Sequence, residues 1–448
     1  CQVEVAPGVV NGIVCGARNF FVGDKVVVTL PGAALPGGFE IAARKTYGHI
    51  SDGMIASSRE LGLSDEHEGI LRLSSMGLDP EVGTDALELL GLAESAAEVN
   101  VTPDRGYCLS IRGIAREFSH ASGAKFVDPA AQFETYSGQG IALSVSDSAP
   151  IHQKPGCSSF FLLGVSNINA QAATPNWMVN RLKLAGMRSI SIAVDITNYV
   201  MLELGQPLHA YDAEKLVGGF SVRRANAGES LETLDGKLRD LHPEDLLICD
   251  DQGPIGLAGV MGGARTEVSE STTKVILEAA SFDPISIARS ARRHKLPSEA
   301  SKRFERGVHR LVSRVAASRA AQLLVELAGG KRDGSRADFS MEIGQHAIEM
   351  SLDFPSQLVG FSYSPQDVIA TLEAIGCLVT QTAETLQVTP PSWRPDLTHK
   401  TDLAEEVARL IGYDKIPVRL PVAPPGRGLT RKQQLRRRAL SSLTGAGF

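Results

Sequence analysis

The chain has 448 residues, of which 43% are hydrophobic and 21% charged, as in an ordinary globular protein. No apolar run approaches the roughly 20 residues of a membrane-spanning helix, so no membrane partner is expected. The six cysteines form no CxxC pair, which argues against a thiolate zinc site or a disulfide scaffold and favours a reducing, cytoplasmic compartment. The net charge of −6 disfavours nucleic-acid binding only if it is evenly spread, and the segment from Arg289 to Arg319 is basic.

Residues 1–63 hold short strand-like runs separated by glycine and proline, a pattern that predicts a small antiparallel barrel. Basic side chains are interleaved with these runs, namely Arg18, Lys25, Arg44, Lys45 and Arg59. The pattern leaves open an ordinary solvated barrel face and an oligonucleotide-binding barrel. From about Val82 to Ser122 the pattern becomes helical, with a turn at Pro103 and Gly106.

The block from Phe126 to about Gly330 is long enough for a sizeable core. Thr174 and Pro175 predict a helix entry, with Thr174 as the cap and Pro175 in the first helical position, and this helix should end at Gly186. Strand-like runs cover 220–224, 245–250 and 275–277, and Asp283-Pro284 should begin another helix. We therefore predict a mixed α/β domain.

Residues 340–420 predict a smaller unit, in which an amphipathic helix precedes one strand and a second strand precedes a proline-rich loop. A last helix over 402–411 should stop at Gly412. Residues 422–428 have the composition of a linker, and another helix should begin near Arg431.

The stretch 190–212 places polar residues at the edge of an apolar run, among them Asp195, Asn198, Gln206 and His209. Buried polar groups are costly unless they are paired, so they serve either a local network or a ligand. The glycine-rich GLAGVMGG at 256–263 lets backbone approach a ligand closely, although it matches no phosphate-binding motif.

Each candidate site residue also has a purely structural explanation. His209 fits a core histidine as well as a site residue, and Glu278, after an apolar run, fits an ion-pair anchor as well as a ligand contact. Ser298 after Pro297 predicts a helix N-cap, and Ala300 an ordinary packing residue. No serine or cysteine stands in a nucleophile motif, so the pattern predicts a pocket and no named reaction.

Two charged segments also have two interpretations. The basic run that begins with Arg289, Arg292 and Arg293 fits a solvated helix face or phosphate contacts. Four carboxylates lie close together near the end of the chain: Asp396, Asp402, Glu405 and Glu406. Asp402 as N-cap and Glu405 as third helical residue would form a capping-box-like pair, whereas four carboxylates also suit Mg²⁺.

Several long blocks stand out. The first are IVCGARN at 13–19, LPGAALPGGFEI at 30–41 and SDGMIASSRELGL at 51–63. Later blocks are VDITNYVMLELGQPLHAYD, LAGVMGG, ILEAA, RRHKLPSEASKRFERGV and PSWRPDLTHKTDLAEEVARLIGYDKIP. Over essentially the whole chain they resemble the tRNA-binding barrel, editing domain and small domain of bacterial phenylalanyl-tRNA synthetase beta subunits. Two positions depart from that pattern: Ser298 stands where threonine is also found, and His309 stands where aspartate is expected.

The resemblance implies a multidomain α+β fold. An OB-fold β-barrel would cover 1–81, a helical connecting segment 82–125, a mixed α/β editing domain 126–335 and a small α+β domain 340–420. Residues 421–448 would form a linker and the start of a catalytic-like domain. We expect the chain to be a fragment, with the first barrel strands upstream and the catalytic-like and anticodon-binding domains downstream.

The resemblance also implies a reaction, the hydrolysis of tyrosine mischarged onto phenylalanine tRNA. The family's editing positions fall on His209, Gly262, Glu278, Ser298 and Ala300. Glu278 would bind the phenolic hydroxyl that distinguishes tyrosine from phenylalanine. His209 and Ser298 would position water or the ester, while Gly262 and Ala300 would leave room for the substrate. The alternative is a non-catalytic tRNA-binding or assembly module with a degenerate pocket.

Partners and cofactors follow from the same resemblance. Asp396, Asp402, Glu405 and Glu406 match positions associated with a Mg²⁺ ion shared with the alpha subunit. The alpha subunit would use ATP to attach phenylalanine to tRNA(Phe), and its class-defining motifs are not in this chain. The expected assembly is a cytoplasmic α2β2 heterotetramer that binds tRNA(Phe).

Overall fold

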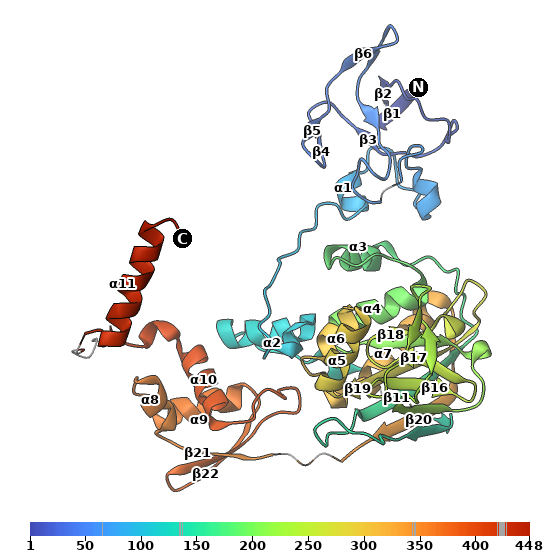
Figure 1. Ribbon diagram of the computed structural model, residues 1–448. Helices are drawn as coiled ribbons and strands as arrows, with labels where there is room; N and C mark the ends of the chain where they lie inside the picture. Colours follow the sequence, from blue (N-terminus) through green and yellow to red (C-terminus); the bar gives the residue numbers. More distant parts are fainter. Residues whose placement is uncertain are drawn as a thin grey trace. The chain divides into compact units, whose positions relative to one another are not determined.

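The structure is a computed structural model that describes residues 1–64, 66–133, 136, 138–342, 344, 346–418, 420, 426 and 428–448 (Figure 1). The chain divides into two compact units. The first unit holds residues 1–100, 169–199 and 326–329, and the second holds 101–168, 200–325 and 330–448. Most of the predicted linker at 422–428 lies outside the described residues. None of the helices in these ranges is both long and apolar enough to cross a membrane.

The first unit begins with short antiparallel strands, and glycines with positive φ, such as Gly8 and Gly48, reverse the chain between them. The strands pair in twos: β1 (Gln2–Ala6) with β2 (Val9–Gly12), β3 (Val28–Thr29) with β8 (Met54–Ile55), β4 (Ala34–Leu35) with β5 (Phe39–Glu40), and β6 (Arg44–Thr46) with β7 (His49–Ser51). Each of these strands has one antiparallel partner strand among the described residues, and the small barrel expected from the sequence stays a prediction.

The helices of the first unit are α1 (Ala86–Leu89), α3 (Asn176–Leu184) and the start of α4 (Ile192–Leu204), which continues into the second unit. α3 begins one residue later than predicted, with Pro175 as its N-cap. The hydroxyl of Thr174 donates instead to the buried carboxylate of Asp195, at 2.6 Å. Gly186, with φ of 77°, follows the end of the helix, close to the predicted stop.

Two five-stranded sheets form the centre of the second unit. One has the order β10 (Leu143–Val145), β13 (Phe220–Arg224), β16 (Leu246–Asp250), β17 (Gly253–Leu257), β18 (Met261–Gly262). The other has the order β12 (Leu208–Asp212), β19 (Lys274–Phe282), β11 (Cys157–Ser166), β20 (Lys331–Ser340), β9 (Gln139–Gly140). A separate hairpin joins β14 (Ser230–Glu232) to β15 (Leu238–Asp240). The three predicted strands are thus β13, β16 and part of β19.

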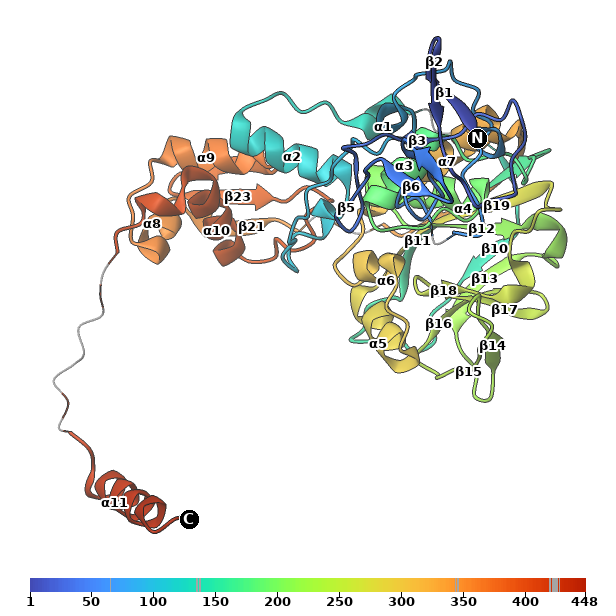
Figure 2. The ribbon, with the colours of Figure 1, turned by 90° about the horizontal axis from the view of Figure 1, so that it is seen from above.

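The two sheets share one apolar core, to which both contribute buried side chains such as Leu162 and Leu247. Helices α5 (Pro284–His294) and α6 (Glu299–Phe304) add Ile287 and Phe304 to this core, and α7 (Ser313–Ala328) follows them in the chain. α5 begins where the sequence predicted, because the Asp283 carboxylate accepts a hydrogen bond from the backbone N–H of Ser286, at 2.8 Å. Figure 2 shows β12 beside β19, which places the centre of the predicted site on this sheet.

A smaller α+β region lies within the second unit, as the sequence predicted. Its sheet has the order β21 (Ile348–Ser351), β23 (Thr385–Thr389), β22 (Leu378–Thr382). Helices α8 (Phe354–Val359), α9 (Pro365–Ala374) and α10 (Lys400–Ile411) share a core with it, and Gly412 ends α10 as expected. The unit also includes α2 (Ile111–Ser122) and α11 (Arg431–Gly445).

Candidate functional site

A small cavity of about 80 Å³ lies in the second unit, lined by both sheets and by α6. Its lining includes His209 from β12, Glu278 from β19, Gly262 from β18 and Ala300 from α6. One water needs roughly 10–15 Å³, so the cavity has room for more than one. Four of the five predicted editing positions therefore meet in one place.

His209 lies directly opposite Glu278 across the β12–β19 pairing. Its Nε2 atom is buried and has no hydrogen-bond partner among the described residues. Burial lowers the pKa of His209 to about 4, so the imidazole is neutral at pH 7. The ring packs edge-on against Tyr211, with ring centroids 4.5 Å apart. The arrangement offers a neutral, unpaired ring nitrogen to a ligand or a water.

Gly262 makes the position of this ring possible. A Cβ atom on Gly262 would lie 2.5 Å from Cε1 and 2.7 Å from Nε2 of His209. Both distances are below any real carbon contact, so a larger residue would displace the imidazole.

Glu278 is a buried carboxyl group on β19. Its Oε2 atom accepts a hydrogen bond from the phenol of Tyr211, at 2.5 Å. Burial raises the pKa of Glu278 to about 7, although the hydrogen bond from Tyr211 opposes that rise. No lysine or arginine in the described part of the chain pairs with this carboxylate, so Glu278 is not the ion-pair anchor that the sequence left open.

Ser298 is the N-cap of α6, as predicted. Its Oγ atom accepts from the backbone N–H of Ser301 and donates to the backbone oxygen of Val260, both at 3.0 Å. Ser298 is not part of the cavity lining, but Val260 is. The hydroxyl is therefore engaged locally and ties the start of α6 to the cavity wall.

Sequence reasoning missed Tyr211, which is fully buried and lines the cavity. Tyr211 stands two residues after His209 on the same strand. Because alternate residues of a strand share a face, the HAYD run already placed the phenol beside the imidazole.

Two other polar residues of the central stretch have structural roles. Asp195, in the first unit, accepts hydrogen bonds from the hydroxyls of Thr174 and Ser189, both at 2.6 Å. Gln206, in the second unit, is fully buried and donates to the backbone oxygen of Ala280, at 2.8 Å. For Asp195 the local-network interpretation holds, whereas the buried Oε1 of Gln206 has no hydrogen-bond partner among the described residues.

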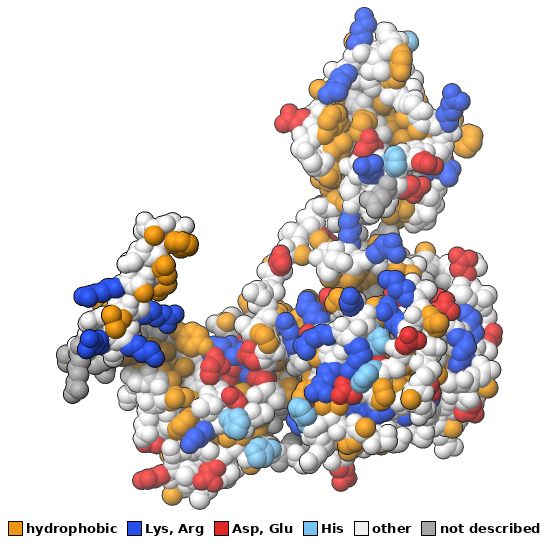
Figure 3. All heavy atoms as spheres, viewed as in Figure 1, with side chains coloured by type: hydrophobic (Ala, Val, Ile, Leu, Met, Phe, Trp, Pro, Cys, Tyr) orange, Lys and Arg blue, Asp and Glu red, His pale blue; other side chains and the backbone are white. Residues whose placement is uncertain are grey.

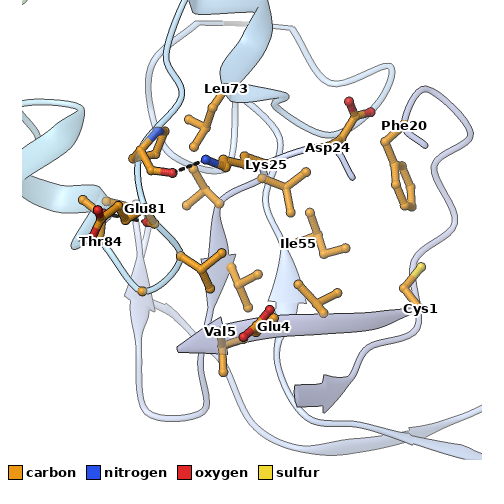
Figure 4. Close-up of a pocket in the computed structure, with 18 of the residues that line it drawn as sticks. Cys1, Glu4, Val5, Phe20, Asp24, Lys25, Ile55, Leu73, Glu81 and Thr84 are labelled. Carbon is orange, nitrogen blue, oxygen red and sulfur yellow. Dashed lines mark hydrogen bonds between the residues drawn. The ribbon is translucent and has the colours of Figure 1, made fainter. Parts of the chain in front are cut away.

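A larger cavity, of about 870 Å³, lies in the first unit (Figure 4). Its lining is mostly apolar and includes Ile55 and Leu73. Lys25, which also lines it, is paired with Asp79 at 2.6 Å and donates to the backbone oxygen of Pro80 at 2.5 Å. This cavity brings together none of the predicted site residues, so size alone does not mark it as the chemical site.

The basic run after Arg289 is bound largely within the second unit. Figure 3 shows Lys and Arg side chains over α5 and α6, with acidic side chains among them. Arg289 and Arg293 both pair with Glu244, at 2.8 and 2.6 Å, and Arg293 also pairs with Asp245. Four further arginines bond to acidic side chains or backbone oxygens: Arg303, Arg310, Arg314 and Arg319. Most of this run therefore holds the fold rather than forming a free phosphate-binding face.

Asp402 and Glu405 lie differently from the predicted capping pair. α10 begins at Lys400, which makes Asp402 its third residue, and the Asp402 carboxylate accepts from the backbone N–H of His399 at 2.8 Å. Glu405 accepts from Arg105, at 3.1 Å. The predicted N-cap at Asp402 is wrong, because His399 precedes the first helical turn.

Glu406 is fully buried among three arginines, Arg105, Arg394 and Arg409. Burial alone would raise the pKa of Glu406, but these cations hold it well below its usual range. Asp396 also binds Arg394, at 2.6 Å. Within the described residues no three metal-ligating side chains come together as a metal site requires. The arginine-bound carboxylates do not fit the expected Mg²⁺ ion.

His309, the departure noted above, is half-buried beside Arg112 and Ser392, at 3.3 and 2.9 Å. Burial and the nearby arginines lower its pKa to about 3, so the ring is neutral. The positive charges of Arg112 and Arg116 are balanced by Asp128, whose carboxylate binds both arginines, at 2.6 and 2.7 Å.

Known proteins match this chain along its whole length. Residues 156–329 match the B3/4 domain, and residues 348–413 match the tRNA synthetase B5 domain. The chain is 59% identical to the phenylalanine–tRNA ligase beta subunit of Leifsonia xyli subsp. xyli and 53% identical to that of Streptomyces avermitilis. Both alignments cover 100% of this chain and 55% and 54% of those proteins, so the chain spans about half the length of the curated relatives it matches.

One solved structure shows a weak likeness. It is an N-terminal fragment of the phenylalanyl-tRNA synthetase beta subunit from Pyrococcus horikoshii, 14% identical, with a TM-score of 0.35. The match covers 69% of this chain and 85% of that one, and a likeness at this level carries no argument about the fold.

Proposed function

Because this chain belongs to the family of phenylalanine–tRNA ligase beta subunits, we propose that it binds tRNA(Phe) and hydrolyses Tyr-tRNA(Phe) formed in error. The proposed editing site is the cavity between the two sheets of the second unit. One observation carries the proposal: in the part of the chain that the structure describes, a buried histidine nitrogen without a partner lines the same cavity as a buried carboxylate without a cation.

Glu278 is the proposed selector of the substrate. Tyrosine and phenylalanine differ by one hydroxyl, and an apolar synthetic pocket rejects an added hydroxyl only modestly. A second site that hydrogen-bonds this hydroxyl selects for it. A hydrogen bond to a charged group contributes about 1.5–3 kcal/mol, which corresponds to about 10–100-fold in rate or affinity.

His209 is proposed to orient the attacking water. In the hydrolysis the water oxygen bonds to the ester carbonyl carbon, the bond from that carbon to the ribose oxygen breaks, and a proton ends on the ribose oxygen. With a pKa of about 4, His209 is a weak base, so its role is to hold the water by a hydrogen bond. Gly262 leaves space for the ring, Ala300 leaves space for the substrate, and Ser298 fixes the wall at Val260.

The wider setting is part of the same proposal. Residues 1–81 would contact tRNA, residues 126–335 would form the editing domain, and residues 340–420 would precede a catalytic-like domain. The complete cytoplasmic enzyme would pair two such chains with two alpha subunits, which use ATP to attach phenylalanine.

One observation favours a second candidate, a tRNA-binding or assembly module without editing activity. The phenol of Tyr211 already occupies one oxygen of Glu278, so the pocket is partly filled by the chain itself.

The deciding experiment measures the deacylation of Tyr-tRNA(Phe) and Phe-tRNA(Phe) by the complete enzyme carrying this chain. Editing predicts selective hydrolysis of Tyr-tRNA(Phe) that falls at least about tenfold in Glu278→Ala and in His209→Ala, with tRNA binding retained. Glu232→Ala, at an exposed carboxylate of the same unit, should keep the wild-type rate. Negligible, equal rates on both substrates in the wild type would instead support the assembly module.

A further inference from the structure

Strands β12 and β19 are antiparallel neighbours (Figure 2), and they carry Tyr211 and Glu278 respectively. Tyr211 lies directly opposite Ile276, which makes Glu278 its diagonal neighbour on the same face. Diagonal neighbours are within reach of aromatic and other long side chains. The phenol oxygen of Tyr211 lies 2.5 Å from Oε2 of Glu278.

The hydroxyl of Tyr211 is confined to this direction. The side chain is fully buried, and its ring packs edge-on against His209 and Phe220, at centroid distances of 4.5 and 5.4 Å. A Cβ atom on Gly256 would lie 3.7 Å from the hydroxyl, so the backbone of β17 passes close to it. Burial raises the pKa of Tyr211 well above its ordinary value, and the phenol therefore keeps its proton and donates it.

Glu278 has a second oxygen that the protein leaves available. A carboxylate accepts hydrogen bonds at both oxygens. Among the described residues, Tyr211 alone donates to Glu278. Because Glu278 also lines the cavity, a hydroxyl bound there meets one oxygen that is held in place and not yet used.

We propose that Tyr211 is a positioning residue for hydroxyl selection, whose phenol fixes one oxygen of Glu278 and leaves the other for the hydroxyl of a bound tyrosyl group. The inference rests on the proposed editing function. Tyr211 acts through Glu278 and does not reach the ester. Its hydrogen bond prevents the carboxylate from turning to another donor and favours the charged form, which accepts a hydroxyl most strongly.

Among the described residues, few other titratable groups lie near Tyr211 and Glu278. His209 is neutral above a pKa of about 4, and the buried thiols of Cys157 on β11 and Cys249 on β16 have pKa values raised far above neutrality. The Glu278 carboxyl, with a pKa of about 7, is therefore the group near the cavity that changes charge around neutral pH. Tyr-tRNA(Phe) hydrolysis should rise with pH as Glu278 ionises.

The test is the pH profile of Tyr-tRNA(Phe) hydrolysis by the complete enzyme with Tyr211→Phe. This change keeps the ring and removes the donor, so the acid limb should move up by about one pH unit, the equivalent of one hydrogen bond to a charged group. In a Glu278→Gln background the same change should produce no shift. Tyr363→Phe removes another buried hydroxyl, which has no hydrogen-bond partner within the described ranges, and should leave the pH profile unchanged. If the acid limb of the Tyr211→Phe profile lies at the same pH as in wild type, the proposal is wrong, even if hydrolysis is slower at every pH.

A second readout does not depend on hydrolysis. Infrared titration of the Glu278 carboxyl, identified by its loss in Glu278→Gln, should show a midpoint about one pH unit higher in Tyr211→Phe. An unshifted midpoint overturns the inference whatever the enzyme hydrolyses. A shifted midpoint in an enzyme that hydrolyses no Tyr-tRNA(Phe) confirms the contact, refutes the editing function and with it the selection role.

Discussion

Two glutamates of the second unit are buried to a similar degree and have opposite surroundings. Glu406 on α10 lies among three arginines, which hold its pKa well below the usual range. Glu278 on β19 has, among the described residues, a single neutral donor, Tyr211, and burial raises the pKa of Glu278 to about 7. The first carboxylate is neutralised by the fold, and the second is not.

The difference shows how a structural carboxylate is told from one available to a ligand. A buried charge surrounded by cations is fully used, and removing it leaves the cations unpaired. A buried carboxyl that lines a cavity and lacks a cation is costly to ionise, which is typical of a group kept for binding or catalysis. The following changes test this contrast, in order of decreasing expected effect.

Glu406→Gln should lower the free energy of unfolding by about 3–5 kcal/mol, because an amide cannot neutralise Arg105, Arg394 and Arg409. Urea unfolding measures this loss. The matched control is Glu278→Gln, which strands no cation and should cost far less at pH 7. Similar losses of unfolding free energy in the two variants would contradict the contrast between Glu406 and Glu278.

Gly262→Ala should reduce Tyr-tRNA(Phe) hydrolysis by about 100-fold, because the added methyl group displaces the His209 ring and misplaces a catalytic contact by about 1 Å. Single-turnover deacylation measures the effect. Gly445→Ala in α11, away from the cavity, is the control, since its Cβ would meet nothing within 4 Å. If both variants retain the wild-type rate, the ring position is not important for hydrolysis.

The two glutamates should also respond to pH with opposite signs. The folded-state pKa of Glu278 is raised from 4.5 to about 7, so its contribution to stability is present below pH 4.5 and is lost as the pH rises through 7. Between pH 5 and 8, wild type should lose about 1–3 kcal/mol relative to Glu278→Gln. For Glu406 the pKa is lowered, so the advantage of wild type over Glu406→Gln should shrink as the pH falls below 4.5. Unfolding free energies across this range give both slopes, and a flat difference for Glu278→Gln contradicts the first.

Ser298→Ala should have the smallest effect, a loss of about 1 kcal/mol in the free energy of unfolding, because the N-cap of α6 is removed. Ser298→Thr keeps the hydroxyl and should remain close to wild type in unfolding measurements. If Ser298→Ala abolishes hydrolysis while stability falls no further than this, the hydroxyl has a role in the reaction beyond capping.

Local signals made several of these features predictable from the sequence. The caps at Asp283 and Ser298 need only residues within the next turn, and β13 and β16 follow from short apolar runs. The resemblance named four residues that line one cavity. Whether those residues edit tRNA is still a prediction.

The remaining features depend on partners that spacing cannot reveal. Glu406 binds Arg105, which is 301 residues away in the chain, and nothing in the motif around Glu406 indicates that pairing. The N-cap of α10 was predicted at Asp402 but lies at His399, because nothing in the sequence showed that the helix begins before Asp402. Tyr211 was missed although strand alternation pointed to it, since its role depends on the diagonal contact with β19.

The central place of β11 in its sheet has a consequence for biosynthesis. Both of its neighbouring strands come much later in the chain: Leu162 lies opposite Glu278 on one side and Ala337 on the other. Residues 157–166 therefore leave the ribosome well before either partner strand has been made, and pairing at such long sequence separation is slow. A nascent chain that has not yet reached Ser340 carries an apolar strand with an unpaired edge, the kind of segment that chaperones protect. The cavity lined by His209 and Glu278 is thus a late product of translation, since the middle strand of its sheet can pair only after both neighbouring strands have been made.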